Sequence, residues 1–192
     1  MILHTFRLTT FSPLLLVFTL FLVGCVSTPD APVADASEDG NWRARGKFSF
    51  KSPERKQSGN FDWQQSGDQY KVRLFGPLGL GAVSISGDDT AVTIEKGGEV
   101  HQSDQPNEMI QQATGLSMPV SALADWLIGQ PEHNPNTLVH FDDNGKIELA
   151  RSQGWRIAYV NDTQAPHLPK RIFAERQGTR LNLVITRWTT SP

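Results

Sequence analysis

The sequence predicts a mainly β (α+β) fold with roughly ten or eleven antiparallel strands and two or three short helices. Three observations predict it. From Trp42 onward, apolar residues alternate with polar ones at a period of two, which is typical of strands with one buried face. Short turns rich in glycine and aspartate separate these runs, as in antiparallel hairpins. Between residues 104 and 131 the apolar period becomes helical.

The first five or six strands follow one another as a meander. Turns at 66–68, 87–89 and 97–98 separate them, and a longer glycine-rich connection runs from residue 76 to residue 81. The positions expected to face inward are Trp42, Ala44, Gly46, Phe48, Phe50, Phe61, Trp63, Tyr70, Val72, Leu74, Val83, Ile85, Val92, Ile94 and Val100.

A first short helix is expected next. Asp104 can cap its N-terminus, Pro106 falls in its first turn, and Gly115 ends it. Its apolar stripe is Met109, Ile110 and Ala113. Because a helix this short is not stable alone, we expect it to pack on the sheet.

A second helix has apolar residues at i, i+3, i+4 and i+7, with Trp126 beside the stripe, and ends at Gly129 and Pro131. The stripe residues are Val120, Leu123, Ala124 and Leu127.

The strands then resume, with Asn144-Gly145 as a strong hairpin signal between the first two. His140 is expected on the face opposite its apolar neighbours. The inward positions of this half are Val139, Phe141, Ile147, Leu149, Trp155, Ile157, Tyr159, Ile172, Ala174, Leu181, Leu183 and Ile185, with Trp188 near the end of the last strand.

The expected inner face is rich in large aromatic side chains. A strongly curved sheet with such a lining can enclose an apolar cavity. The alternative is a solid core in which the aromatics pack on the helices, and the residue pattern leaves both open. The candidate cavity-lining residues are Trp42, Phe48, Phe50, Phe61, Trp63 and Trp155.

The connection at residues 74–81 (LFGPLGLG) places leucines where turns usually carry polar residues. An exposed leucine loses roughly 1.5–3 kcal/mol relative to a buried one. Leu78 and Leu80 either fold back onto the core or project to enter an apolar environment such as a membrane.

The first 24 residues have the pattern of an export signal. Arg7 precedes an apolar run at residues 14–23, which is too short to span a bilayer. The run ends in Leu22-Val23-Gly24-Cys25, which resembles the lipobox of bacterial lipoproteins, and that resemblance implies cleavage before Cys25 and acylation of its thiol and new amine. Val26 follows in place of aspartate, and by the same resemblance this favours the outer membrane.

Residues 25–40 are expected to form an acylated cysteine and a disordered tether, since residues 26–40 carry four acidic residues, no basic ones and two prolines. Fifteen residues reach roughly 20 Å as a random coil and about 50 Å fully extended. Residues 41–192 are expected to form the folded domain.

Composition and motifs argue against several classes of function. The net charge of −2 and the pI near 6.2 do not suggest a nucleic-acid partner. With Cys25 as the only cysteine, an intrachain disulfide and a cysteine-based zinc site are excluded. Ser121 lacks a Gly-x-Ser-x-Gly setting, and no glycine-rich phosphate loop precedes a helix.

The remaining polar residues have ordinary explanations. His101, His133, His140 and His167 lack metal-ligand spacing, and the paired aspartates lie in turns. Arg43, Arg45, Lys71 and Arg73 fall on the polar faces of strands, as solvated residues or, less simply, as a docking patch. We therefore expect no enzyme, no metal and no cofactor.

Taken together, these features make the chain resemble the LolB family. The matching residues are Arg45-Gly46 with Phe48; Phe61, Trp63, Gln64 and Gln65 followed by Tyr70; Gly76-Pro77-Leu78-Gly79; Glu108-Met109-Ile110 with Thr114-Gly115; Met118-Pro119-Val120 leading to Leu123, Trp126, Leu127, Gly129 and Pro131; Gly154-Trp155 with Ile157 and Tyr159; Leu168-Pro169; and Trp188.

The resemblance implies an incomplete antiparallel β-barrel, covered by helices and enclosing an apolar cavity for acyl chains. It also implies an outer-membrane lipoprotein on the periplasmic face, which accepts acylated lipoproteins from a LolA-like carrier and inserts them into outer-membrane lipids. Because the sequence shows no nucleotide site, we expect the hand-off to proceed without nucleotide hydrolysis, and we expect a monomer. The protruding leucine of the family corresponds to Leu78, and Leu80 adds a second leucine two positions later. The alternatives are an outer-membrane lipoprotein that acts as a scaffold with a solid core, and a carrier of free lipids.

Overall fold

The computed structural model describes residues 40–115, 120–131, 137–161 and 168–190. The predicted signal at residues 1–24, Cys25, the rest of the tether up to residue 39, and His133 and His167 lie outside these ranges. The elements are β1 (Asn41–Lys51), β2 (Lys56–Ser66), β3 (Gln69–Phe75), β4 (Val83–Gly87), β5 (Val92–Lys96), β6 (Glu99–Ser103), α1 (Pro106–Thr114), α2 (Val120–Leu127), β7 (Leu138–Phe141), β8 (Ile147–Ser152), β9 (Trp155–Asn161), β10 (Pro169–Arg176) and β11 (Thr179–Thr190), with a 3-10 turn at Pro77–Gly79.

All eleven strands belong to one antiparallel sheet, in the order β6-β5-β4-β3-β2-β1-β11-β10-β9-β8-β7. The first and last strands pair at its centre, and β6 and β7 form its two edges. The sheet is therefore open, and the predicted mainly β fold of about ten or eleven strands with two or three short helices is confirmed.

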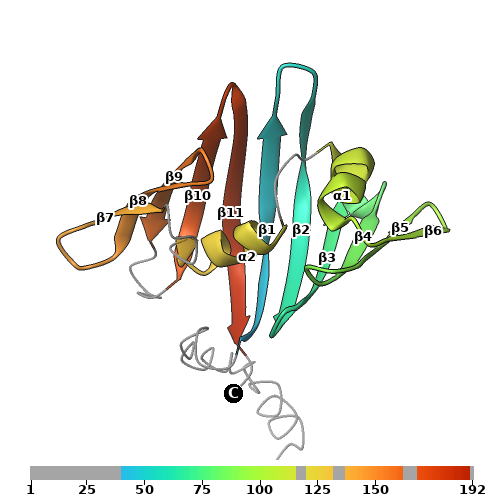
Figure 1. The fold of residues 1–192 in the computed structure, drawn as a ribbon, viewed down its shortest axis with the longest axis horizontal. Helices are drawn as coiled ribbons and strands as arrows, with labels where there is room; N and C mark the ends of the chain where they lie inside the picture. The colour runs from blue at the N-terminus through green and yellow to red at the C-terminus, as the bar shows by residue number, and fades with distance from the viewer. Residues whose placement is uncertain (1–39, 116–119, 132–136, 162–167, 191–192) are drawn as a thin grey trace, which may run out of the picture. The chain divides into compact units, whose positions relative to one another are not determined.

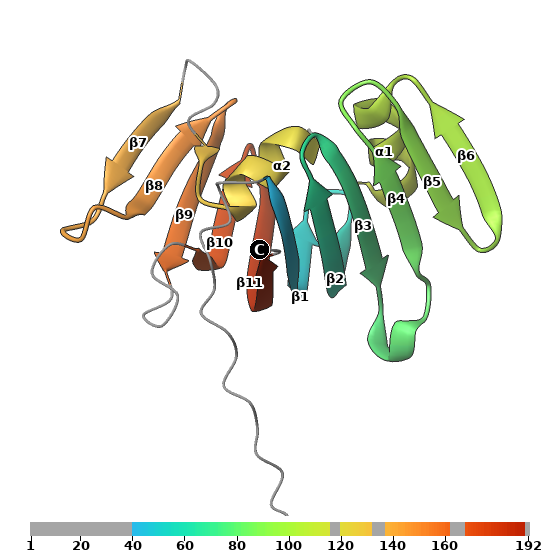
Figure 2. The same ribbon diagram turned by 90° about the horizontal axis from the view of Figure 1, so that it is seen from below.

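The sheet is curved, and both helices lie on its concave face (Figure 1, Figure 2). Helix α1 ends where Gly115 takes a left-handed conformation (φ 76°) and its N–H donates to the carbonyl of Gln111 at 2.7 Å. The predicted cap at Asp104 is wrong: the N-cap position is Gln105, which makes no side-chain capping bond, and Pro106 follows it. The hydroxyl of Ser103 accepts from the N–H of Gln105 instead (2.9 Å).

The central strand pair requires one specific glycine. The register of β1 against β11 shifts between Arg45 and Gly46. A Cβ at Gly46 would lie 2.1 Å from the carbonyl oxygen of Val184 and 2.8 Å from the ring of Phe61. Only glycine fits this close approach, so the bulge and the packing of Phe61 beneath it depend on the same residue.

Four expectations about the core need correction. Val100 and Phe141, expected to face inward, are 60% and 54% exposed, because they lie on the edge strands β6 and β7. In β8 the buried residues are Ala150 and Ser152, because Ala150 pairs with Ile157; Leu149 lies on the other face, after a register shift at the neighbouring β7. Trp126, expected beside the α2 stripe, is only 1% exposed and packs edge-on against Trp155 with ring centroids 5.8 Å apart. Trp126 therefore anchors α2 to the β9 side of the sheet.

Candidate functional site

A cavity of about 50 Å³ lies between the concave face of the sheet and the two helices. Strands β1, β2, β3, β4 and β11 supply one wall, and α1 and α2 supply the other. Every lining residue is apolar: Phe48, Phe61, Trp63, Val72, Leu74, Ile85, Ile110, Val120, Leu123, Leu127, Leu181 and Leu183. Such a lining offers no hydrogen bond to a polar ligand and suits a hydrocarbon chain.

Periodicity explains how the sequence builds both walls. On the strands, inward residues recur at every second position, as in Phe61 and Trp63 of β2. On α2, Val120, Leu123 and Leu127 recur at helical spacing and so share one face. The apolar faces of the strands and of the helices lie opposite each other across the cavity, so both kinds of element are needed to enclose it.

The structure brings together three of the six residues that the sequence suggested for this lining. Phe48, Phe61 and Trp63 line the cavity. Trp42, Phe50 and Trp155 are buried in the core but are not among the lining residues. Trp42 stacks on Trp63 with centroids 6.0 Å apart, and Trp155 contacts Trp126 and the guanidinium of Arg176 instead.

Sequence reasoning missed most of the lining because it considered only aromatic residues. The aliphatic contributors fall on the same alternating faces, and Leu181 and Leu183 of β11 are examples. The stripe of α2 was also visible in the sequence as a packing surface. What the sequence did not show is that this stripe faces β1–β4 and β11 across a cavity.

The cavity is small compared with an acyl chain. One water-sized group needs about 10–15 Å³ by this measure, so about 50 Å³ holds on the order of four such groups. A fatty acyl chain of about fifteen methylenes is several times larger. The cavity in this conformation therefore does not hold a whole acyl chain.

The leucine loop (residues 76–81) joins β3 to β4 and projects from their end of the sheet (Figure 2). Leu78 is 98% exposed and Leu80 is 71% exposed, so neither leucine folds back onto the core. The N–H of Gly76 donates to the carbonyl of Leu80 (2.9 Å), and the N–H of Leu80 donates to the carbonyl of Pro77 (3.3 Å). These two bonds close the loop and hold the leucines outward.

The backbone conformation of Leu78 is also unfavourable in free energy, in addition to the exposure of its side chain. Its φ is 58°, in the left-handed region that leucine rarely adopts. Such a conformation costs about 1–3 kcal/mol and occurs mostly at functional positions. An exposed apolar side chain on a strained backbone is difficult to explain by stability, which favours a functional role for the loop.

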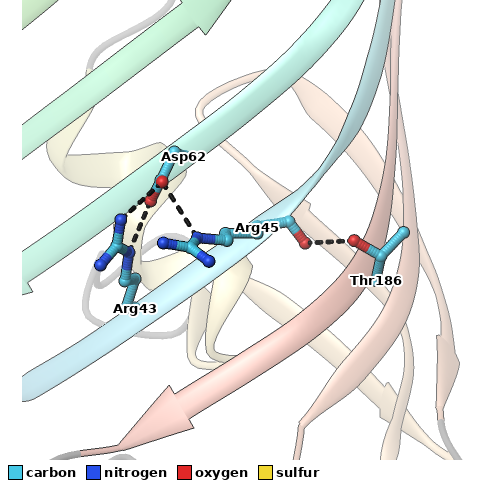
Figure 3. Close-up of polar contacts among 4 residues, drawn as sticks. All are labelled: Arg43, Arg45, Asp62 and Thr186. Atoms are coloured by element: carbon cyan, nitrogen blue, oxygen red, sulfur yellow. Dashed lines mark hydrogen bonds and ion pairs between the residues drawn. The ribbon is translucent and has the colours of Figure 1, made fainter.

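On the convex face, the basic residues of β1 are engaged within the fold (Figure 3). The Arg43 guanidinium donates to both carboxylate oxygens of Asp62 at 2.7 Å, and Arg45 donates to one of them at 3.0 Å. The bond from Arg43 outweighs partial burial and lowers the pKa of Asp62 below its usual value. The Thr186 hydroxyl donates to the carbonyl of Arg45 (3.1 Å), which ties β11 to the same point. The cluster fastens β1 to both its neighbours.

Other kinds of site find little support within the described ranges. No group of three or more potential ligands could hold a metal ion among those residues. The described helices include none that is long and apolar enough to cross a membrane. His101 and His140 are both exposed, beside Glu99 and Glu148 respectively.

The chain matches one family of known proteins over most of its length. The model of the family described as "Outer membrane lipoprotein LolB" matches residues 40–188. The Chromohalobacter salexigens protein named outer-membrane lipoprotein LolB is 32% identical over 189 residues, covering 90% of this chain and 87% of its own length. The Vibrio vulnificus protein of the same name is 30% identical over 206 residues, covering 96% and 98% respectively.

A solved structure has the same fold. The crystal structure of a LolA superfamily protein from Nitrosomonas europaea superposes with a TM-score of 0.55 at 10% sequence identity. The match covers 82% of this chain and 89% of that one. At this identity the likeness concerns the fold alone.

Proposed function

This chain belongs to the LolB family of outer-membrane lipoproteins, and from that premise we propose that it receives acylated lipoproteins from a LolA-like periplasmic carrier and delivers them into the outer membrane. The observation that carries the proposal is the cavity lined entirely by apolar residues between the sheet and the helices. An acyl chain of about fifteen methylenes costs on the order of 12 kcal/mol to expose to water. Acylated cargo therefore needs an apolar binding site both on the carrier and on the protein that receives it.

Cargo receipt opens the cavity. Val120 and Leu123 of α2 and Ile110 of α1 cover the concave face, and these two short helices have little stability of their own. Separating them from the sheet exposes apolar surface, and burial of the incoming acyl chain offsets this cost. The cavity wall on β1–β4 and β11 then becomes the floor on which the chain lies.

Release uses the leucine loop. Leu78 and Leu80 gain burial when they enter the bilayer, roughly 1.5–3 kcal/mol for each leucine that leaves water. Both are exposed, and we assign the membrane contact to the pair. The loop thus holds the cavity beside the membrane that takes the cargo.

The direction of transfer follows from relative affinity. The sequence has no glycine-rich phosphate loop, so we assign the driving force to an increase in affinity from carrier to receiver to bilayer. Acylation of Cys25 anchors the chain in the outer membrane, and residues 26–40 tether the folded domain to that anchor. We propose that the protein acts as a monomer.

The test is a transfer assay with purified components. Radiolabelled lipoprotein bound to a LolA-like carrier is mixed with this protein in vesicles, in the absence of nucleotide. The proposal predicts that label passes to this protein and then to lipid. An absolute nucleotide requirement for the hand-off, or no transfer at all, would contradict it.

A further inference from the structure

The hairpin turns of the sheet fall at two opposite ends, because neighbouring strands are antiparallel. We call the end that carries the leucine loop the leucine end, and the opposite one the far end. Besides the leucine loop, the leucine end carries the turns at residues 52–55, 97–98, 153–154 and 177–178. The far end carries the hairpin turns at residues 67–68, 88–91 and 142–146.

The two ends carry opposite charge. The leucine-end turns, with the two residues on either side of each, contain eight basic and four acidic residues. The far-end hairpin turns, counted in the same way, contain one basic and six acidic residues. The leucine-end residues are Lys51, Arg55, Lys56, Lys96, Arg151, Arg156, Arg176 and Arg180 against Glu54, Glu95, Glu99 and Glu175. The far-end residues are Lys146 against Asp68, Asp88, Asp89, Asp142, Asp143 and Glu148.

Two lysines lie beside the leucine loop. Lys56 and Lys96 line one surface groove together with Gly76 and Gly81 of the loop. Both side chains are exposed, and neither forms an ion pair within 4.0 Å in the ranges that the structure describes. A projecting leucine pair flanked by ammonium groups matches a membrane boundary, where apolar side chains reach the acyl region and lysines stay at the level of the phosphates.

We propose that the leucine end docks on a bilayer surface that contains anionic phospholipid, with Lys56 and Lys96 at the headgroup phosphates and Leu78 and Leu80 inserted between them. The inference rests on the proposed function and adds the lipid chemistry and the orientation. Each lysine near an anionic surface strengthens binding roughly fivefold at physiological salt. The acidic far end is repelled by the same surface, so the charge pattern also selects which end approaches.

The start of the described chain is compatible with this orientation. Gly40 lies at the far end, where its carbonyl accepts the N–H of Gly67 (3.1 Å). Phe75, next to the leucine loop, pairs with Asn60, which pairs with Lys47, so Phe75 and Lys47 lie at the same level of the sheet. Lys47 is seven residues from Gly40 along β1, which is about 23 Å. Residues 26–40 span up to about 50 Å when extended. An acylated Cys25 and the leucine loop can therefore contact one bilayer together.

The test uses the acylated full chain reconstituted in vesicles. Because Cys25 is the only cysteine, Gln57→Cys or Gln69→Cys supplies a single free thiol for a polarity-sensitive dye. Gln57 lies in the groove beside Lys56, and Gln69 is exposed at the far end. With phosphatidylglycerol in the vesicles, we expect the dye at position 57 to move into the headgroup region and the dye at position 69 to stay in water.

The charge dependence is tested with paired reversals. Lys56→Glu with Lys96→Glu should reduce the docked fraction at least tenfold on these vesicles, and high salt should do the same to the unsubstituted protein. The matched control is Lys71→Glu with Lys146→Glu, which makes the same change away from the leucine end. Lys71 lies four residues, about 13 Å, from Phe75 along β3, which exceeds the Debye length of about 8 Å, and Lys146 lies in a far-end turn, so docking should persist.

Two results would overturn the inference. Docking that ignores the reversal at Lys56 and Lys96 would show that charge has no part in it. A reversal that keeps the vesicle signal but abolishes binding to the LolA-like carrier would make the leucine end a protein-docking surface. Cargo transfer is measured in parallel: charge-independent docking with intact transfer contradicts this inference alone, whereas failed transfer by the unsubstituted protein contradicts the proposed function.

Discussion

The guanidinium of Arg43 on β1 donates two hydrogen bonds to the carboxylate of Asp62 on β2, one to each oxygen and each 2.7 Å long. Arg45 binds the same carboxylate at 3.0 Å, so one acidic residue holds two basic neighbours on the convex face. This ion-pair cluster gives a structural role to Arg43 and Arg45, two of the four basic residues that the sequence left open as a docking patch. It also has a measurable consequence for stability as a function of pH.

Asp62→Asn should destabilise the fold at neutral pH by about 1 kcal/mol, since a partly exposed two-point ion pair is worth roughly that much. The pKa of Asp62 is lowered in the folded state, chiefly by the bond from Arg43. Its contribution is therefore present above the unfolded pKa, near 4, and is lost as the pH falls through the lower folded value.

Urea unfolding of both proteins between pH 7 and pH 2 measures this difference. The gap between them should narrow below about pH 4. Asp68→Asn, in the exposed turn between β2 and β3, is the matched control and should change little. A gap at Asp62 that stays constant down to pH 2 would contradict the ion-pair account.

Gly46→Ala should be among the most destabilising single changes in the sheet. The new Cβ would lie 2.1 Å from the carbonyl oxygen of Val184, and neither backbone can yield without breaking the β1–β11 ladder. We expect a loss of at least about 2 kcal/mol. Gly67→Ala is the comparison, since its Cβ meets nothing within 4 Å and only its positive φ is strained. Equal losses for the two variants, measured by urea unfolding, would contradict the packing argument.

Leu78→Asp with Leu80→Asp should impair release of cargo into the bilayer while receipt from the carrier continues. Stability should not fall, because both side chains are exposed and Asp tolerates the left-handed backbone at position 78 better than Leu. The measurement is the partition of labelled cargo between this protein and vesicles after transfer. Phe141→Asp, at a residue 54% exposed in β7, controls for loss of apolar surface elsewhere. If insertion survives in the double variant, the loop has another role.

Val120→Asp places a carboxylate in the cavity lining at a position that is only partly buried. Binding of a fluorescent fatty acyl probe should weaken by at least about tenfold, because the charge must be desolvated beside the chain. Gln112→Asp, on an exposed position of α1, should leave binding unchanged. Equal binding by both variants would place the acyl site away from α2.

Tether length should matter if the anchor and the leucine loop contact one bilayer. Deleting residues 30–37 leaves seven residues between Cys25 and Asn41, with a reach of about 25 Å. That barely covers the roughly 23 Å to the level of Phe75, so cargo insertion should fall although the anchor is intact. Replacing the same eight residues with glycine and serine should preserve insertion. An active deletion variant would contradict the orientation.

Much of the fold follows from local patterns. The inward residues of β1 and the stripe of α2 are fixed by periods of two and 3.6, which the sequence displays directly. Leu149 was placed wrongly because a register shift at the adjacent β7 depends on strand pairing and not on the β8 sequence. The cap at Asp104 was wrong because the helix begins one residue later than the capping pattern suggests, with Gln105 at the N-cap.

The site was less predictable because it depends on contacts between distant segments. Phe61 and Trp155 both alternate inward, yet only Phe61 lines the cavity, since the first and last strands pair at the centre of the sheet and separate the two. In the leucine loop, glycine and proline predicted a bend but not its direction. The direction in which Leu78 projects depends on the backbone hydrogen bonds that close the loop, and the sequence does not specify these bonds.

The most direct test of the account is to locate the acyl chain of bound cargo. Lipoprotein carrying a photoreactive group midway along one acyl chain is transferred from the carrier, irradiated and analysed by mass spectrometry. The account predicts crosslinks to cavity residues such as Leu123 and Leu183. Crosslinks confined to the convex face, or none on this protein while cargo still reaches the vesicles, would contradict it.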